Sequence, residues 1–171
     1  MKLLSILFLF FSIGFANIVD FKSFQADFIQ KVTNSLGTSI KYEGKIKIKG
    51  KNKILWQYKT PTIKNVFITK NSLIIDEPEL EQVIITSLDK QFNIIKLINE
   101  SKKISKNIYK NSIDGTTYQI VLKKNIPNSI TYKDKLDNSV YIKFINGKKN
   151  IKLSDDIFYF NPPDYYDIIK K

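Results

Sequence analysis

The spacing of apolar residues changes along the chain, and this change separates predicted helices from predicted strands. Residues 20–33, DFKSFQADFIQKVT, place apolar side chains at steps of three and four, which is the period of an amphipathic helix. These side chains are Phe21, Phe24, Phe28 and Val32. Asp20 is a suitable N-cap, and Gly37 in the following NSLG provides a backbone turn. The pattern therefore predicts a first helix over residues 20–33.

From Thr38 onward the apolar period is two, starting with Ile46 and Ile48 between lysines. Short alternating segments follow, separated by turn-forming residues, as in an antiparallel meander. They are KILWQYK (53–59), IKNVFITK (63–70), SLIID (72–76), EQVIITS (81–87), NIYKNSI (107–113), TTYQIVLKK (116–124), NSITYKD (128–134) and NSVYIKFIN (138–146). Strands connected this briefly form a curved sheet, because sheets twist.

One segment, residues 90–104, interrupts the strand pattern. Phe92, Ile95 and Ile98 share one helical face there, which predicts a short second helix. Neither an internal repeat nor a linker divides residues 17–171, so we expect one domain of the α+β class.

The strand KILWQYK carries apolar residues on both faces. Ile54, Trp56 and Tyr58 share one face, and Leu55 points to the other; Phe67 lies opposite its apolar neighbours in the same way. A curved sheet with one face on a core and the other lining a cavity would show this pattern. A sheet sandwiched between helices, or one closed into a filled barrel, would show it too. The pattern leaves these alternatives open.

The first sixteen residues, MKLLSILFLFFSIGFA, have the form of a secretory signal peptide. Lys2 precedes a hydrophobic run that is too short to span a bilayer, and Ala16 ends a small-residue cleavage site. The alternative is an N-terminal membrane anchor. Asn17 stands where a bacterial lipoprotein would have its lipid-bearing cysteine. We therefore expect cleavage after Ala16 and an unanchored mature chain.

The composition argues against an enzyme. The chain contains neither cysteine nor histidine, so the commonest nucleophiles, bases and metal ligands are missing. One Ser-x-x-Lys spacing, from Ser87 to Lys90, is expected by chance in so lysine-rich a chain. The acidic run DEPELEQ is interpreted as a solvated hairpin turn around Pro78 instead of a cation site. We predict no catalytic residue and no metal site.

The formal net charge is +12, and it falls to +11 when Lys2 leaves with the signal peptide. Such an excess favours anionic partners such as headgroups, acidic proteins or nucleic acid. Lysines interleaved with aromatic residues would suit nucleic acid. However, the export signal and the lack of a recognition motif argue against nucleic-acid binding. Lysines that alternate with isoleucine are typical of the solvent-exposed face of a strand. We expect no nucleic-acid partner.

Five segments, in their order and spacing, resemble the LolA family of periplasmic lipoprotein carriers. They are SFQADFIQKV, YEGKIKIKG, LWQYKTP, EPELEQ and FYFNPP. The resemblance implies an unclosed antiparallel β-barrel, or half-barrel, with helices covering its open side and a cavity for lipoprotein acyl chains. It also implies a monomeric periplasmic carrier without a cofactor. Such a carrier receives lipoproteins from an ATP-driven transporter of the inner membrane and delivers them to the outer membrane or to a receptor there.

The resemblance also implies which residues form the site. The expected cavity residues are Ile18, Phe21, Phe28, Ile46, Ile48, Ile54, Trp56, Tyr58, Val66 and Ile68, and the expected lid residues are Phe92, Ile95 and Ile98. Ile18, Phe21 and Phe28 would belong to the first helix. For each residue, ordinary core packing is the alternative.

The chain departs from the family at one point. Many members have an Arg-Pro pair after the first strand, and the arginine helps to latch the lid. Here Gly50 and Lys51 occupy those positions, so the arginine latch is missing. Lys49 or Lys51 would replace it imperfectly, because lysine lacks the guanidinium fork.

Two other functions are alternatives to the carrier. An amphiphile-sensing regulatory domain of the same fold would relay ligand binding to a partner protein. Sensors of this kind usually carry an additional domain, so the length of the chain favours the carrier. A hydrolase would need a nucleophile–base pair, which the sequence does not offer.

Overall fold

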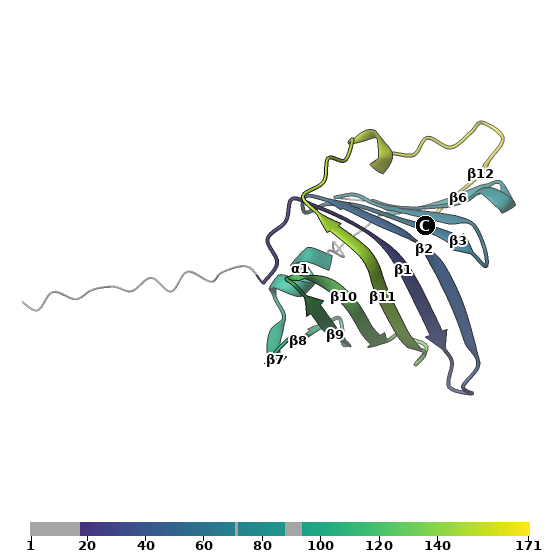
Figure 1. Cartoon of the computed structure of the whole chain (residues 1–171). Helices are drawn as coiled ribbons and strands as arrows, with labels where there is room; N and C mark the ends of the chain where they lie inside the picture. Colours follow the sequence, from purple (N-terminus) through teal and green to yellow (C-terminus); the bar gives the residue numbers. More distant parts are fainter. Residues whose placement is uncertain (1–17, 71, 88–93) are drawn as a thin grey trace, which may run out of the picture.

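The computed structural model describes residues 18–70, 72–87 and 94–171. These residues form one twelve-stranded sheet in the order β12-β6-β5-β4-β3-β2-β1-β11-β10-β9-β8-β7. Figure 1 shows that the sheet curves around helix α1 without closing. The predicted signal peptide, residues 1–16, its cleavage after Ala16 and the predicted lid residue Phe92 lie outside the described residues.

The strands follow one another as a meander, and β11 returns to pair with β1. All neighbouring strands are antiparallel except β12, which runs parallel to β6. The elements are β1 Ser23–Thr33, β2 Ser39–Lys49, β3 Lys53–Thr60, β4 Lys64–Ile68, β5 Ser72–Glu77, η1 Pro78–Leu80, β6 Gln82–Ser87, α1 Ile94–Asn99, β7 Lys102–Ser105, β8 Ile108–Ile113, β9 Thr116–Lys123, β10 Ile126–Lys133, β11 Ser139–Lys149, η2 Asp156–Phe158 and β12 Asp167–Lys170. The unclosed antiparallel sheet confirms the half-barrel predicted from the sequence.

The predicted first helix over residues 20–33 is wrong, because Ser23–Thr33 form strand β1. Phe24, Phe28 and Val32 are four residues apart, and side chains at that spacing share a face in a strand as well as in a helix. Ala26 fills the position between Phe24 and Phe28 and is also buried, as the two-residue period of a strand requires. Phe28 therefore lies on a strand, and Ile18 and Phe21 precede that strand.

The second predicted helix is shorter than expected. Of residues 94–104, the part of this segment that the structure describes, Ile94–Asn99 are helical, and Lys102–Ser105 form the edge strand β7. Helix α1 is thus the one α-helix within the described ranges, and an array of helices covering the open side is not observed. None of the helical segments that the structure describes has the length and apolar character to cross a bilayer.

The inner face of the sheet carries the main hydrophobic core. Apolar side chains of β1, β2, β3, β9, β10 and β11 meet there with Ile94, Leu97 and Ile98 of α1. Phe28 packs directly over Gly44 of β2, its partner in the strand pairing. An aromatic ring that covers a strand glycine replaces the packing that a missing side chain cannot provide.

The outer face carries a smaller core, which explains the second apolar face of the Trp56 strand. Leu55 and Phe67 are buried there beneath Phe158 of η2. The segment after β11 crosses this face on the side of the sheet opposite α1 (Figure 1). The sheet is therefore covered on both sides around β3 and β4, by α1 inside and by the C-terminal segment outside.

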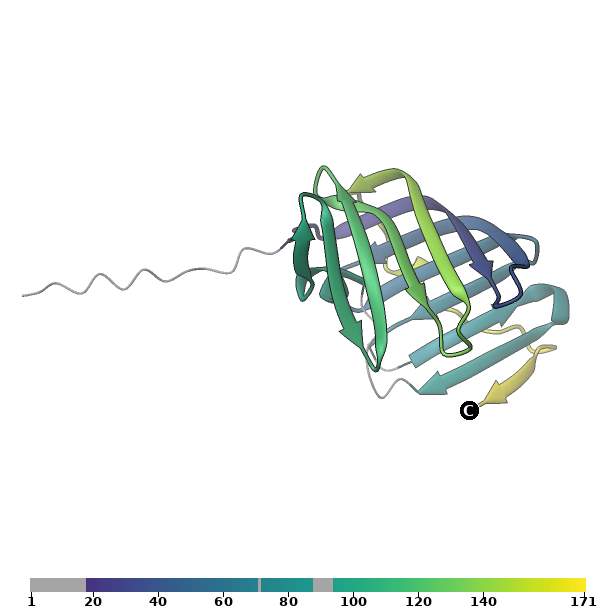
Figure 2. The same ribbon diagram turned by 90° about the horizontal axis from the view of Figure 1, so that it is seen from below.

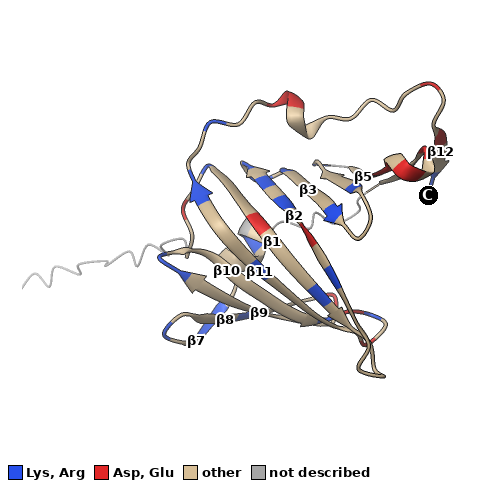
Figure 3. Cartoon of the chain, turned by 45° about the vertical axis from the view of Figure 1, so that its right-hand side comes forward, with Lys and Arg blue, Asp and Glu red and all other residues tan. Residues whose placement is uncertain are grey.

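The acidic run forms a turn, as predicted, but one of its members is buried. Pro78–Leu80 form η1 between β5 and β6, and Figure 3 shows acidic residues gathered beside β12. Asp76 of β5 is buried and accepts a hydrogen bond from Asn65 Nδ2 at 2.8 Å. Burial raises the pKa of this carboxyl group, and the hydrogen bond from Asn65 partly offsets that rise.

Candidate lipid-binding cavity

An apolar cavity of about 200 Å³ lies between the inner face of the sheet and α1. Strands from both halves of the meander contribute to its wall, because β11 pairs with β1. Its lining residues are Gln30, Trp56, Tyr58, Val66, Ile68, Ile94, Tyr118, Ile130, Tyr132 and Ile142. None of these described lining residues carries a formal charge, so the cavity suits a hydrocarbon and not an ion.

Aromatic rings fix the shape of one wall. Phe28 contacts Trp56 and Tyr58 edge-on, with ring centroids 4.9 and 5.1 Å apart. Trp56 and Tyr58 lie two residues apart on β3 and are stacked with centroids 6.5 Å apart. Edge-on and stacked contacts of this kind stabilise ring positions beyond the area that they bury. The wall is therefore a preformed surface of rigid rings.

The wall contains few polar groups, and its tyrosine hydroxyls remain protonated. The Tyr58 hydroxyl donates a hydrogen bond to Gln30 Oε1 at 3.0 Å. Burial raises the pKa of Tyr58 to about 12 and that of Tyr132 to about 12 as well. Both phenols are therefore neutral at physiological pH, and the cavity stays uncharged.

Helix α1 closes one side of the cavity and is held by a small set of hydrogen bonds. The Val19 backbone N–H donates to Asn99 Oδ1 at 2.8 Å, which joins the start of the described chain to the helix. Asn111 Nδ2 of β8 donates to the Leu97 carbonyl at 3.1 Å, and Ser101 Oγ donates to the same oxygen at 2.6 Å. The bonds from Asn111 and Ser101 satisfy the Leu97 carbonyl in the last turn of the helix, which has no partner within the helix.

Lys49, one of the two lysines expected to replace the missing arginine imperfectly, makes other contacts. Lys49 Nζ donates to the Leu153 carbonyl at 2.8 Å and pairs with Asp155 at 3.0 Å. Both partners belong to the C-terminal segment on the outer face of the sheet. Lys49 therefore fastens that segment, and these contacts do not involve α1.

The residues predicted for the cavity divide into two groups. Trp56, Tyr58, Val66 and Ile68 line it. The other six belong to the same hydrophobic core but do not line the cavity; they are Ile18, Phe21, Phe28, Ile46, Ile48 and Ile54. Of the predicted lid residues, Ile98 is buried in α1, and Ile95 lies in α1 with a side chain outside the described part.

The second half of the wall consists of residues that the sequence does not assign to the cavity. Tyr118, Ile130, Tyr132 and Ile142 come from β9, β10 and β11, which were predicted as strands without a role in the cavity. Alternation along these strands was the available signal, since each of the four residues has at least one apolar or aromatic neighbour two positions away. Nothing in the local sequence indicated that this face would lie opposite Trp56.

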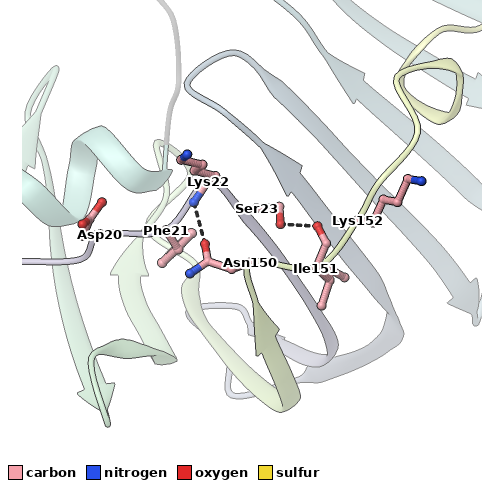
Figure 4. A pocket seen from close by; sticks show the side chains of 7 residues that line it. All are labelled: Asp20, Phe21, Lys22, Ser23, Asn150, Ile151 and Lys152. Carbon is pink, nitrogen blue, oxygen red and sulfur yellow. Dashed lines mark hydrogen bonds between the residues drawn. The ribbon is translucent and has the colours of Figure 1, made fainter.

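A larger groove lies near the start of β1, but its chemistry is polar (Figure 4). It has a volume of about 520 Å³ and is lined by Asp20, Phe21, Lys22, Ser23, Asn150, Ile151 and Lys152. The Lys22 backbone N–H donates to Asn150 Oδ1 at 2.9 Å, and Ser23 Oγ donates to the Ile151 carbonyl at 2.6 Å. Charged side chains at its rim make it a poor site for an acyl chain.

Comparison with known proteins gives consistent results. Residues 20–161 match the sequence profile of the family described as outer membrane lipoprotein carrier protein LolA. A relative from Campylobacter jejuni named outer-membrane lipoprotein carrier protein is 34% identical over 169 residues, covering 99% of both chains. A relative of the same name from Wolinella succinogenes is 33% identical over 150 residues, covering 87% of both chains.

A solved structure shares the fold at low sequence identity. It is an uncharacterized conserved protein from Thermus thermophilus, with a TM-score of 0.55 and 12% identity. The match covers 88% of this chain and 91% of that chain. This likeness concerns the fold alone.

Proposed function

Because this chain belongs to the LolA family of outer-membrane lipoprotein carrier proteins, we propose that it shelters lipoprotein acyl chains in the cavity between the sheet and α1. Carriers of this family are not enzymes, which confirms the expectation drawn from the missing cysteine and histidine. The observation that carries the proposal is an uncharged, aromatic-walled cavity covered by one short helix.

Transfer of a hydrocarbon chain from water into such a site is strongly favourable. Each methylene removed from water contributes roughly 0.8 kcal/mol, so the acyl chains of a lipoprotein need a cover while they cross an aqueous compartment. The neutral phenols of Tyr58 and Tyr132 leave no charge that would have to be desolvated when a chain enters. The cavity wall therefore matches the chemistry of the cargo.

The cavity must enlarge to accept its cargo. Its volume of about 200 Å³ is below the roughly 300–1,000 Å³ typical of sites for drug-sized ligands. A six-residue helix is marginal by itself and depends on its packing and hydrogen bonds. Each hydrogen bond contributes only about 0.5–1.5 kcal/mol net, so α1 can be displaced at a modest cost. We propose that this helix is the movable lid.

The route of the cargo follows from the same proposal. The signal peptide, residues 1–16, would direct the chain to the periplasm, where residues 17–171 would act as a monomer. An ATP-driven transporter of the inner membrane would load the carrier with a lipoprotein. The carrier would then deliver it to the outer membrane or, where one exists, to a receptor there.

A matched pair of substitutions tests the cavity. Val66 is half-buried in the cavity wall, and Val66→Glu would place a carboxylate where an acyl chain enters. We expect the affinity for a soluble triacylated lipopeptide to fall at least about tenfold, because the carboxylate would lose water when the chain binds. The measurement is a calorimetric titration with the lipopeptide.

The control is Val121→Glu. Val121 is also half-buried in a strand, but it lies between the inward-facing Ile120 and Leu122 and so points to the outer face. We expect this variant to bind the lipopeptide like the wild type. Equal affinities for Val66→Glu and Val121→Glu, with both proteins folded by circular dichroism, would show that the cavity does not hold the acyl chains.

A further inference from the structure

Two hairpin turns at one end of the sheet lie side by side. The pairing of β1 with β11 extends to Thr33 and Ser139, the last residue of β1 and the first of β11. The β1–β2 turn and the β10–β11 turn are therefore neighbours, and Figure 2 shows both hairpins projecting past the sheet at the same end. Each turn presents a leucine to solvent, with Leu36 89% and Leu136 82% exposed.

The two turns have the same construction. Asn34 Oδ1 accepts hydrogen bonds from the backbone N–H groups of Leu36 at 3.0 Å and Thr38 at 2.9 Å. Asp134 Oδ1 accepts the equivalent bonds from Leu136 and Asn138, both at 2.9 Å. Each leucine therefore stands on an ordered turn and is held away from the body of the protein. A contact made by such preformed tips costs little conformational entropy.

Apolar residues connect the tips to the cavity along the inner face. Val32 pairs with both Ile40 and Val140, and Ile40 is half-exposed. Val140 pairs in turn with Tyr132, which lines the cavity. Paired apolar residues thus lead from the base of the two hairpins to the cavity.

We propose that Leu36 and Leu136 insert together into the interfacial layer of a lipid bilayer and dock this end of the carrier on the membrane. Two separate protruding tips fit a deformable layer of headgroups and hydrocarbon, whereas a protein partner would have to supply two matching pockets. Exposed Tyr141 on the neighbouring strand is of the residue type enriched at membrane interfaces.

The charges around the tips are compatible with a bilayer surface. Residues 31–43 and 133–141 contain four lysines and three acidic residues. Lys41 pairs with Glu43 at 2.6 Å, and Lys133 pairs with Asp137 at 2.9 Å. The local charge is therefore nearly balanced, so insertion of the leucines dominates, while the positive charge of the whole chain attracts anionic lipid.

Docking and cargo binding are separate properties. The proposed insertion requires only the two turns. Its purpose rests on the proposed carrier function: docking would bring the cavity to the membrane that receives the acyl chains.

Vesicle sedimentation tests the proposal with the cargo-free protein and vesicles of phosphatidylcholine and phosphatidylglycerol. We expect the wild type to sediment with the vesicles and to remain bound in high salt, which screens adsorption by charge alone. Leu36→Ser together with Leu136→Ser should lower the partition coefficient by about tenfold for each leucine. Because both side chains are exposed, thermal stability should not change.

The control is Leu80→Ser. Leu80 is also exposed, at 65%, but it lies in the acidic turn between β5 and β6. This variant should partition like the wild type. The proposal is overturned if the wild type does not sediment with vesicles, or if the double variant partitions as the wild type does, or if Leu80→Ser reduces partitioning as strongly. Lipopeptide titration of the double variant tests cargo binding separately, and we expect it to match the wild type.

Discussion

Replacing Gly44 with alanine is expected to lower the free energy of unfolding by about 3 kcal/mol, at the upper end of the usual cost of overpacking. A Cβ atom at this position would lie 1.9 Å from the Gln57 carbonyl oxygen and 2.9 Å from Cε1 of Phe28. The Gln57 oxygen belongs to the backbone of β3, so it cannot move without disturbing the pairing of β2 with β3. Urea unfolding followed by circular dichroism measures the loss.

Gly147→Ala provides the control for this prediction. The atoms nearest to a Cβ atom there would belong to side chains, with Phe24 Cε2 at 3.2 Å and Ile126 Cδ1 at 3.3 Å. Side chains can shift by a few tenths of an ångström, so we expect a loss of about 1 kcal/mol or less. If Gly147→Ala destabilised the protein as much as Gly44→Ala, the close backbone approach at Gly44 would not explain its effect.

Removal of the Phe158 side chain should have an effect of similar or greater size. Phe158 is buried against Leu55 and Phe67 and forms the centre of the outer-face core. Phe158→Ala is expected to lower the free energy of unfolding by about 3–5 kcal/mol, because it removes buried apolar surface and leaves a cavity. The measurement is again urea unfolding, with the midpoint and slope compared with those of the wild type.

The neighbouring Tyr159 serves as the control for Phe158. Tyr159 is exposed, and Lys53 Nζ lies over its ring at 5.2 Å from the ring centroid. Tyr159→Ala should therefore cost about 1 kcal/mol or less, the usual contribution of an exposed cation–π contact. A loss at Phe158 no larger than the loss at Tyr159 would contradict the assignment of a second core to the outer face.

Most strands of the fold could be predicted from the sequence, because alternation of apolar and polar residues reports directly on a half-buried strand. The first strand was misassigned as a helix for a specific reason. Its large apolar residues, Phe24, Phe28 and Val32, are four positions apart, and that spacing satisfies both periods. Ala26 distinguishes a strand from a helix, because only a strand places it on the same face as Phe24 and Phe28. Its burial depends on tertiary packing and could not be predicted from the sequence.

The site could be predicted only in part, because its two walls come from distant parts of the chain. The apolar residues on both faces of their strand drew attention to Trp56 and Tyr58, but only the resemblance to the LolA family implied that they line a cavity. Tyr132 and Ile142 reach the same cavity through the pairing of β1 with β11, and no local pattern specifies that pairing. The outer-face role of Leu55 likewise depends on Phe158, which lies much later in the chain.

The contacts that hold α1 in place also required the structure. The resemblance implied that an arginine latch is missing at Gly50 and Lys51, but the sequence did not show what holds α1. Asn99 and Asn111 provide these contacts through neutral amide hydrogen bonds. Asparagine is common in this chain, so neither position could be distinguished from an ordinary surface residue without the fold.

The central claim is that acyl chains occupy the cavity beside Trp56, and contact quenching tests it most directly. Trp56 is the only tryptophan and is 7% exposed, so its fluorescence reports on this cavity without interference. A lipopeptide with brominated acyl chains should quench the emission in a saturable manner, whereas the same peptide without acyl chains should leave it unchanged. Emission that stays constant at saturating brominated lipopeptide, while calorimetry shows binding, would place the acyl chains elsewhere and contradict the account.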